Sequence, residues 1–273
     1  MNPKQTPCVL MRAGLDEEEE WQAASEFFPV FRLRSQVPPN SLVVGRYSVL
    51  PYFHELQADL AGTGSVLINS YEQHRYIANF DYLDDVQDAT FATWFRLEDV
   101  PLSMRDKAFV VKGRTNSRKT EWSRKMFAPD FQQAVCIGAE LLTDGLIGPQ
   151  GLVIRQYVPL ETFETAISGL PLTNEWRIFY YRGQRLAHGY YWSQLEDWRA
   201  VERATPEFLR EGLPFADSLA LRLAEKAPFV VLDVAKTASG RWVLVELNDG
   251  CMAGLNDTVP SRVLYENLRK ALA

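Results

Sequence analysis

The sequence lacks the residues and segments from which several common protein classes are built. It has 3 cysteines and 3 histidines among 273 residues, and no C-x-x-C spacing of a zinc site or a redox motif. No apolar stretch approaches the roughly 20 residues that span a bilayer, and residues 1–12 lack the apolar core of a secretory signal. We therefore expect a reduced, cytoplasmic protein with no membrane partner and no disulfide framework.

The best-known phosphate-binding and nucleophilic motifs are also missing. Neither G-x-x-x-x-G-K-[ST] nor G-x-G-x-x-G occurs, and no Ser-His-Asp or Cys-His pattern stands out. The chain does have enough apolar sequence for a core, because 47% of its residues are hydrophobic and 12% are aromatic. This composition excludes intrinsic disorder, and the length allows one large domain or two small ones.

The charge is distributed unevenly along the chain. The formal net charge is −6, so we expect no nucleic-acid partner that depends on extensive phosphate contacts. Residues 105–125 nevertheless hold eight basic residues against two acidic ones, a net charge of +6. Such a basic island in an acidic protein is either a local anion site or a solvated loop.

Strand and helix patterns alternate over the first hundred residues, which predicts a small parallel α/β unit. The predicted strands there are 8–11, 30–33, 42–44 and 65–68, and the predicted helices are 16–28, 52–60 and part of 69–82. Beyond them we predict strands at 108–112 and 152–157, a helix at 129–142, hairpins at 175–191 and 229–247, and helices at 213–226 and 259–272. We predict three domains, at residues 1–95, 96–165 and 166–273.

The second hairpin gathers residues that suggest a metal. If its turn is centred between Ser239 and Gly240, Asp233 lies opposite Glu246, and Asn248 projects from the same face. Two carboxylates on an apolar sheet need a cation or a shared proton. An all-oxygen set suits Mg²⁺ or Mn²⁺. Alternatively, one carboxylate lies at a strand end and the other pairs with a basic residue, and a turn of odd length would shift the register by one.

The basic island begins where a predicted strand ends. Lys112 follows the apolar run 109–111, a position suited to holding a phosphate as a point charge. Small and hydroxyl-bearing residues follow as far as Thr120, and their backbone N–H groups can approach an anion. A nucleoside triphosphate is the ligand that would use both this segment and a divalent cation.

The first hairpin adds charged side chains. With a two-residue turn at 182–183, Arg177 would face His188 and Glu175 would face Tyr190. Arg177 either contacts phosphate or neutralises neighbouring carboxylates. For Glu175 a structural salt bridge is the simpler explanation.

Taken in order, these segments resemble the ATP-grasp superfamily. The chain has a strand ending in Lys112, a loop, a hinge strand around Arg155, the strand 175–179, then Asp233 and the pair Glu246 and Asn248, which looks like the family's acid-x-Asn metal signature. V-G-R-Y-S-V-L-P at 44–51 and I-N-S-Y-E-Q-H-R-Y at 68–76 are similar to a bacterial and phage clade named for an arginine and two lysines.

This resemblance implies an α+β fold of two lobes that clasp a nucleotide, preceded by the small parallel α/β domain, with ATP and Mg²⁺ (or Mn²⁺) as cofactors. The implied roles are phosphate contacts for Lys112, Arg118 and Lys119, the place of a common family lysine for Arg155, the adenine edge for Gln156, Tyr157 and Val158, the ribose for Glu161, catalysis for Arg177 and Lys119, and Mg²⁺ for Asp233, Glu246 and Asn248.

The chemistry implied by the resemblance is ATP-dependent ligation. A carboxylate attacks the γ-phosphate to give an acylphosphate and ADP, and an amine or other nucleophile then displaces phosphate. The expected partners are small-molecule or peptide carboxylates and amines. Some ATP-grasp relatives that resemble this chain in strand 175–179 act instead as ATP-binding assembly chaperones, so the alternative is a binding or regulatory module without turnover.

Four further residues have open roles. Arg46, His74 and Arg75 are candidates for the acceptor side, with a buried and fully hydrogen-bonded histidine as the alternative for His74. Cys251, close to Asn248, is better explained as an inert small residue than as a nucleophile.

Overall fold

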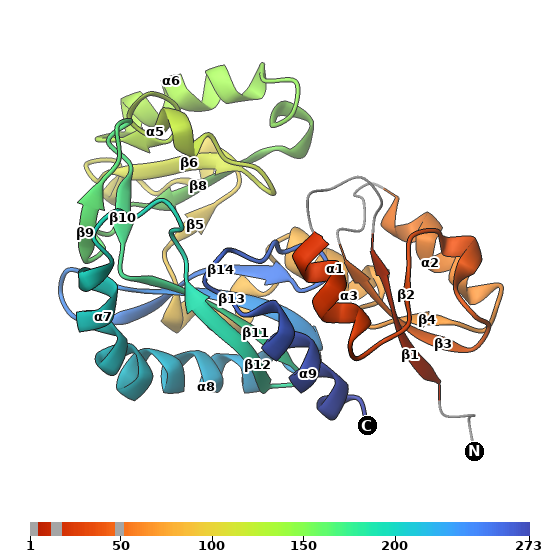
Figure 1. Cartoon of the computed structure of the whole chain (residues 1–273). Helices are drawn as coiled ribbons and strands as arrows, with labels where there is room; N and C mark the ends of the chain where they lie inside the picture. Colours follow the sequence, from red (N-terminus) through yellow and green to blue (C-terminus); the bar gives the residue numbers. More distant parts are fainter. Residues whose placement is uncertain (1–4, 12–17, 47–51) are drawn as a thin grey trace.

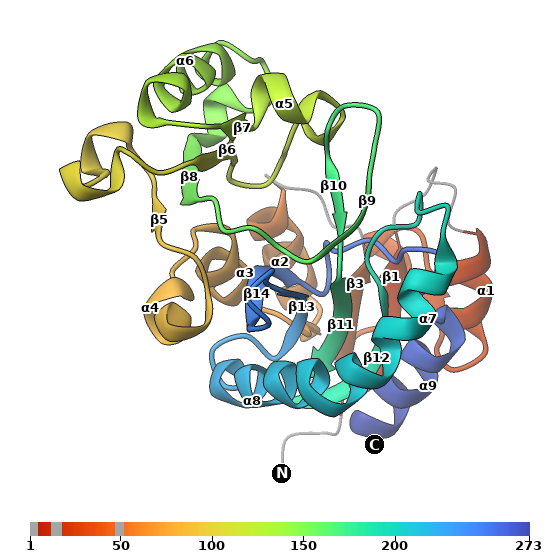
Figure 2. The ribbon, with the colours of Figure 1, turned by 90° about the vertical axis from the view of Figure 1, so that its left-hand side faces the viewer.

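The structure is a computed structural model that describes residues 5–11, 18–46 and 52–273. It has an N-terminal unit (β1–β4 with α1–α3), a middle lobe (β5–β8 with α5 and α6) and a C-terminal lobe (β11–β14 with α7–α9), as Figure 1 and Figure 2 show. The strands are β1 Thr6–Met11, β2 Val30–Phe31, β3 Ser41–Arg46, β4 Val66–Leu67, β5 Thr93–Trp94, β6 Phe109–Gly113, β7 Phe127–Ala128, β8 Leu152–Gln156, β9 Thr162–Thr165, β10 Pro171–Thr173, β11 Glu175–Tyr181, β12 Gln184–Tyr190, β13 Phe229–Lys236 and β14 Trp242–Asp249. The helices are α1 Glu18–Ser25, α2 Phe53–Ala61, α3 Tyr71–Ala78, α4 Leu83–Val86, α5 Trp122–Lys125, α6 Phe131–Leu142, α7 Trp198–Glu207, α8 Leu213–Leu223 and α9 Ser261–Ala271.

The N-terminal unit is the parallel α/β sheet that the sequence predicts. Its strands follow the order β2-β1-β3-β4, and every pair is parallel. Helix α3 starts at a capping box in which Ser70 Oγ accepts from the N–H of Gln73 and the Gln73 side chain accepts from the N–H of Ser70. The predicted helix start at Asp16 and residues 47–51 of the V-G-R-Y-S-V-L-P motif lie outside the described residues.

The middle lobe is an antiparallel sheet in the order β5-β8-β6-β7. Helix α6 covers one of its faces (Figure 2) and buries Ala134, Ile137 and Leu141, which recur at helical spacing. Strand β5 lies N-terminal to residue 95 and pairs with β8 of this lobe. The domain boundaries themselves stay predictions.

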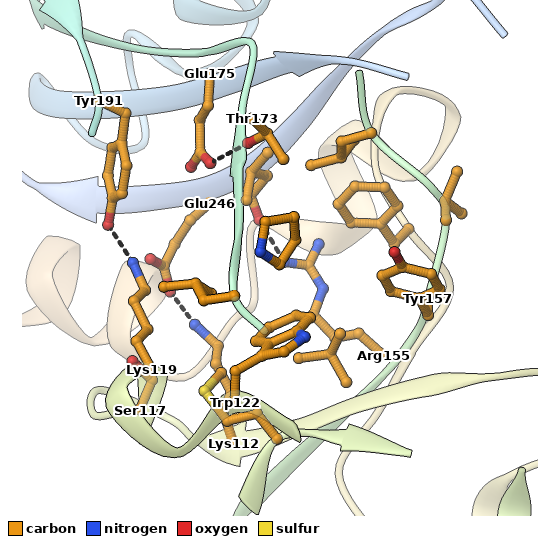
Figure 3. A pocket seen from close by; sticks show the side chains of 18 of the residues that line it. Lys112, Ser117, Lys119, Trp122, Arg155, Tyr157, Thr173, Glu175, Tyr191 and Glu246 are labelled. Carbon is orange, nitrogen blue, oxygen red and sulfur yellow. Dashed lines mark hydrogen bonds and ion pairs between the residues drawn. The ribbon is translucent and has the colours of Figure 1, made fainter. Parts of the chain in front are cut away.

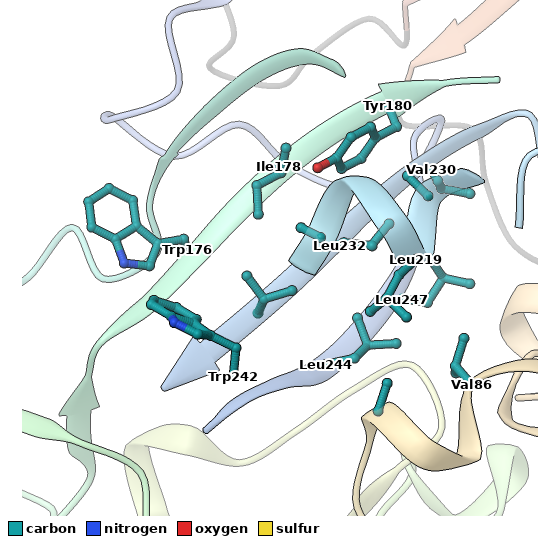
Figure 4. Close-up of a cluster of buried hydrophobic side chains, with 14 of the residues drawn as sticks. Val86, Trp176, Ile178, Tyr180, Leu219, Val230, Leu232, Trp242, Leu244 and Leu247 are labelled. Carbon is teal, nitrogen blue, oxygen red and sulfur yellow. The ribbon is translucent and has the colours of Figure 1, made fainter. Parts of the chain in front are cut away.

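The C-terminal lobe is an antiparallel sheet in the order β12-β11-β13-β14 that is buried on both faces. On one face Trp176, Ile178 and Leu232 pack against α8 in the main core (Figure 4). On the other face Phe179 and Val231 pack toward α9 and the N-terminal unit. Because side chains alternate along a strand, Arg177 and Asp233 share the second face with Phe179 and Val231.

The predicted pairing of Asp233 with Glu246 is confirmed, but the predicted turn is wrong. The strands join through an odd-length loop, residues 237–241, in which the N–H of Thr237 donates to Arg241 O at 2.7 Å. Near this loop Val234 therefore pairs with Leu244, one residue away from the predicted register. A β-bulge that leaves Val245 without a cross-strand partner restores the register at Glu246.

The predicted pairs of the first hairpin are wrong by one residue. Arg177 lies opposite Gly189, and His188 lies opposite Ile178. The predicted register does hold beside the turn, where Tyr180 pairs with Arg185, but a bulge between Phe179 and Tyr180 shifts every pair beyond it. No helix of the described ranges is long and apolar enough to cross a bilayer.

The buried core predicts a strong dependence of stability on Leu232, which is 0% exposed at the centre of β13. Leu232→Ala should lower the free energy of unfolding by about 2–5 kcal/mol, because it removes buried methyl groups and leaves a cavity. Leu102→Ala, at a residue that is 80% exposed, is the matched control and should change it by less than about 0.5 kcal/mol. Urea unfolding measures both. Equal losses in the two variants would contradict this arrangement of the core.

Candidate functional site

A cavity of about 290 Å³ lies between the middle and C-terminal lobes (Figure 3). Strand β6 and the loop after it supply one wall, and β11 and β14 supply the facing wall. The side chains that the figure labels are Lys112, Ser117, Lys119, Trp122, Arg155, Tyr157, Thr173, Glu175, Tyr191 and Glu246. The cavity therefore combines aromatic walls with several charged groups.

The two predicted metal carboxylates are cross-strand neighbours at the edge of this site. Asp233 on β13 lies opposite both Glu246 on β14 and Arg177 on β11. The guanidinium of Arg177 donates from Nε to Asp233 Oδ1 at 2.9 Å and from Nη2 to Oδ2 at 2.8 Å. Asn248 Nδ2 donates to Asp233 Oδ2 at 3.0 Å, so the predicted Asp, Glu and Asn set is assembled on one face. Burial opposes the charge on Arg177, but the Asp233 carboxylate outweighs burial and raises the pKa of Arg177.

Lys112 forms an ion pair with Glu246 across the two lobes. The lysine comes from β6 of the middle lobe, and the carboxylate comes from β14 of the C-terminal lobe. Burial opposes ionisation of Glu246, but the charge and hydrogen bond of Lys112 outweigh burial and lower the pKa of Glu246 to about 2. Each predicted metal carboxylate is thus ionised and neutralised by a cation from another strand.

Arg155 holds the bulge of β14 instead of reaching along the cavity. Its guanidinium donates to Val245 O and, through Nη2, to Thr90 Oγ1 at 2.8 Å. The ring of Phe91 lies 4.8 Å from the guanidinium carbon. Arg155 is buried, and it satisfies the carbonyl of the one residue that the bulge leaves unpaired. Its side chain thereby ties the hinge strand β8 to the strand that presents Glu246.

The basic island is partly neutralised and partly directed at the cavities. Arg118 does not line the cavity, because its Nε donates to Asp144 Oδ2 at 2.9 Å. Lys119 does line it, donates to Tyr191 OH, and lies 4.5 Å from the centre of that ring. The residues of the island that form ion pairs are Lys107, Lys112, Arg118, Arg124 and Lys125. The two remaining cations that line a cavity are Arg114 and Lys119.

The hinge residues Gln156, Tyr157 and Val158 all line the cavity. The N–H of Gln156 donates to Ala92 O and that of Tyr157 to Ala108 O, at 2.9 and 2.8 Å. Within the described residues, the N–H of Val158 has no hydrogen-bond acceptor. Val158 therefore has the backbone donor of this stretch that a bound ligand could use.

Glu161 lies outside the cavity lining. Its carboxylate accepts from Asn174 Nδ2 at 3.1 Å and lies 3.5 Å from Lys236 Nζ. The structure thus brings together all but two of the predicted nucleotide contacts, the exceptions being Arg118 and Glu161.

The residues present fit a hard divalent cation. Within the described part of the chain, no group of three or more His, Cys, Asp or Glu side chains is arranged around a metal, and the Asp233, Glu246 and Asn248 set has two carboxylates with an amide. Each carboxylate oxygen has more than one lone pair, so Asp233 can keep Arg177 and still bind a cation. Oxygen donors beside a phosphate site are the ligands that Mg²⁺ prefers.

Glu175 is a site residue that sequence reasoning missed. It is 4% exposed, lines the cavity, and accepts from Thr173 Oγ1 at 3.1 Å in place of the expected salt bridge. Burial raises the pKa of Glu175 to about 7, although the charge of Lys119 lowers it. Its position on the same strand face as Arg177 was the available signal, but its depth of burial could not be seen in the sequence.

The other candidates are placed as follows. Arg46 is buried and pairs with Glu20, whereas Arg75 is half-exposed beside Glu72. Burial raises the pKa of Cys251 well above its usual value, which supports the inert role. His74 is buried against the end of β14 and lines a second cavity.

Comparison with known proteins gives the family. The model of the ATP-grasp domain of family 3, in the clade named for an arginine and two lysines, matches residues 101–268, and the chain belongs to this family. No curated protein matches the sequence.

Solved structures share the fold over nearly the whole chain. D-cycloserine synthetase DcsG is 16% identical with a TM-score of 0.60, covering 98% of this chain and 100% of its own. A RimK-domain ATP-grasp protein from Sphaerobacter thermophilus is 14% identical with a TM-score of 0.55, covering 96% and 98%. The ATP-grasp ligase PsnB, solved with a phosphomimetic variant of its minimal precursor, Mg and ADP, is 13% identical with a TM-score of 0.57, covering 100% and 98%. The expected ATP-grasp fold is therefore confirmed.

The buried carboxyl of Glu175 predicts a specific dependence of stability on pH. Its folded pKa of about 7 lies above the ordinary unfolded value, so between those two pKa values the folded state binds more protons and stability falls as pH rises. Glu175→Gln removes this loss. Relative to the wild type, the variant should gain about 2–3 kcal/mol in unfolding free energy between pH 4.5 and pH 8. Urea unfolding across this range measures the gain. Glu202→Gln, at an exposed glutamate, is the control, and a pH-independent difference between Glu175→Gln and wild type would refute the protonation state.

Proposed function

We propose that this chain is an ATP- and Mg²⁺-dependent ligase that joins a carboxylate to an amine through an acylphosphate and releases ADP and phosphate. The observation that carries the proposal is the contact between Lys112 of the middle lobe and Glu246 of the C-terminal lobe at one cavity. A phosphate-binding cation and a metal-binding carboxylate meet there, which is where a Mg-nucleotide would need both. Membership of the ATP-grasp family supports the same ligand.

In this proposal the two walls of the cavity divide the nucleotide between them. Lys112 and Lys119 would bind phosphate oxygens, and the N–H of Val158 would meet the adenine edge among the aromatic side chains. Asp233, Glu246 and Asn248 would hold Mg²⁺, which when bound neutralises phosphate charge and orients the triphosphate. Lys112 would then exchange its contact with Glu246 for one with phosphate.

The residues in the site suit phosphoryl transfer without a protein nucleophile. Such transfer depends on positioning and on neutralising negative charge. Arg177 keeps Asp233 ionised and fixed through two hydrogen bonds, and it also donates to Gly254 O at 2.9 Å. Arg177 and Lys119 both lie within 5 Å of the ring centre of Tyr191, so two cations converge beside the carboxylates.

The similar structures support a ligase over other uses of ATP. By their titles, DcsG is a synthetase and PsnB is a ligase that was solved with Mg and ADP. These statements concern those proteins, and their low identity to this chain leaves its substrates open.

ADP release tests the proposal. Mg-ATP is incubated with pairs of carboxylates and amines drawn from the common amino acids, D-alanine and short peptides. We expect ADP and phosphate in equal amounts only when both substrates are present. Glu246→Gln should lower the rate at least about 100-fold, because it removes a charged group that binds the metal at the reacting phosphate, whereas Glu202→Gln should leave the rate unchanged.

Two outcomes would contradict the proposal. ADP release that is independent of any acceptor, or that survives Glu246→Gln, would exclude ligation at this site. Tight nucleotide binding with no ADP from any pair would favour the assembly chaperone or regulatory module.

A further inference from the structure

A second cavity of about 270 Å³ lies on the other side of Glu246 from the first. The two cavities share Glu246, Thr115 and Asn116, so they are neighbours on one carboxylate. Helix α3 of the N-terminal unit supplies His74 and Ile77 to its wall, and the end of β14 supplies Asn248 and Asp249. Its volume is near the lower end of the about 300–1,000 Å³ typical of small-molecule sites.

The ring of His74 is held in one position. Its Nδ1 lies 2.8 Å from Asp249 Oδ2, and the ring stacks on Phe53 at 4.5 Å between centres. Asp249 Oδ1 accepts from Asn69 Nδ2 and from the N–H of Cys251, each at 2.8 Å. Because an ionised carboxylate only accepts hydrogen bonds, Nδ1 is the donor to it. In the neutral ring, Nε2 then carries the lone pair.

This second nitrogen has no partner. His74 is 3% exposed, and within the described residues its Nε2 is a buried polar atom without a hydrogen bond. The other such atoms are Tyr82 OH and Trp242 Nε1, and neither residue lines either cavity. Buried polar groups are nearly always paired, so the wall of this cavity has an acceptor that lacks its donor.

Arg114 supplies an uncompensated positive charge to the same cavity. It is half-buried, and its guanidinium carbon lies 4.9 Å from the ring centre of Phe95. None of the described carboxylates comes within 4.0 Å of it, although Lys112 and Arg118 on either side of it both form ion pairs. The two acids of the cavity wall are already engaged, Glu246 by Lys112 and Asp249 by His74.

We propose that the second cavity binds the amine-bearing substrate of the ligase, a small molecule of the amino-acid class, with Arg114 binding its carboxylate and His74 Nε2 accepting a hydrogen bond from its amine. The inference rests on the proposed function and adds a substrate class to it. An acceptor nitrogen needs an N–H donor, so His74 suits the amine and not the carboxylate that is to be phosphorylated. The shared wall at Glu246 sets this amine beside the proposed phosphate site.

Thermal unfolding of the full chain tests this in the presence of Mg-AMPPNP. The probes are the 20 common L-amino acids and D-alanine, then the amide and the N-acetyl derivative of the best binder, and inorganic phosphate. We expect at least one free amino acid to raise the Tm and to bind about tenfold or more tightly than its amide or its N-acetyl form, because each derivative loses one charged contact.

Variants separate binding from a purely structural role. Arg114→Gln should abolish the preference for the free acid over the amide, and His74→Phe, which keeps a ring against Phe53, should abolish the preference for the free amine. Arg203→Gln and His54→Phe, at exposed residues, should keep both preferences. If His74→Phe does not fold, Arg114→Gln decides alone.

The proposal fails if no amino acid shifts a protein that responds to Mg-AMPPNP, if both variants keep the wild-type preferences, or if phosphate alone binds to the second cavity through Arg114. A protein that does not respond to Mg-AMPPNP contradicts the proposed function instead. An amino-acid shift with both preferences would still support the cavity in that case.

Discussion

Two carboxylates side by side on an apolar sheet are the constraint around which this molecule is arranged. Like charges at cross-strand positions destabilise a sheet, and burial adds to that cost. Arg177 from the adjacent strand neutralises Asp233, and Lys112 from the other lobe neutralises Glu246. The second contact joins the lobes through a charge that a Mg-nucleotide can take over, so the same interaction is structural without a ligand and functional with one.

The bulge at Val245 makes this arrangement possible. Leu244 and Leu247 both face the main core, although an unbroken strand would point them to opposite faces. The extra residue turns Glu246 to the face of Asp233, and Arg155 binds the freed carbonyl of Val245. The hinge arginine therefore acts on the site through the backbone of β14, at a distance from the phosphate role that the resemblance implied.

The sequence was sufficient for features that depend on local period and order. The period-2 pattern of the last hairpin predicted that Asp233 and Glu246 are neighbours, and the alternation of early strands predicted the parallel sheet. The odd loop and the bulge were missed because neither glycine nor proline marks Val245, and their shifts cancel at Glu246. Contacts between distant segments, such as His74 with Asp249, and the burial that keeps Glu175 protonated depend on tertiary packing that no local pattern encodes.

The most direct test of the central claim is thermal unfolding with Mg-ATP, Mg-GTP, and ATP with a chelator. At a nucleotide concentration of about 100 times Kd, binding should add about 2.7 kcal/mol, a rise in Tm on the order of 5–10 °C for a chain of this size. If Asp233 and Glu246 hold the metal of a bound nucleotide, the rise will appear with Mg-ATP and largely vanish with the chelator. The same rise with and without the metal, or no rise with any nucleotide, would contradict that assignment.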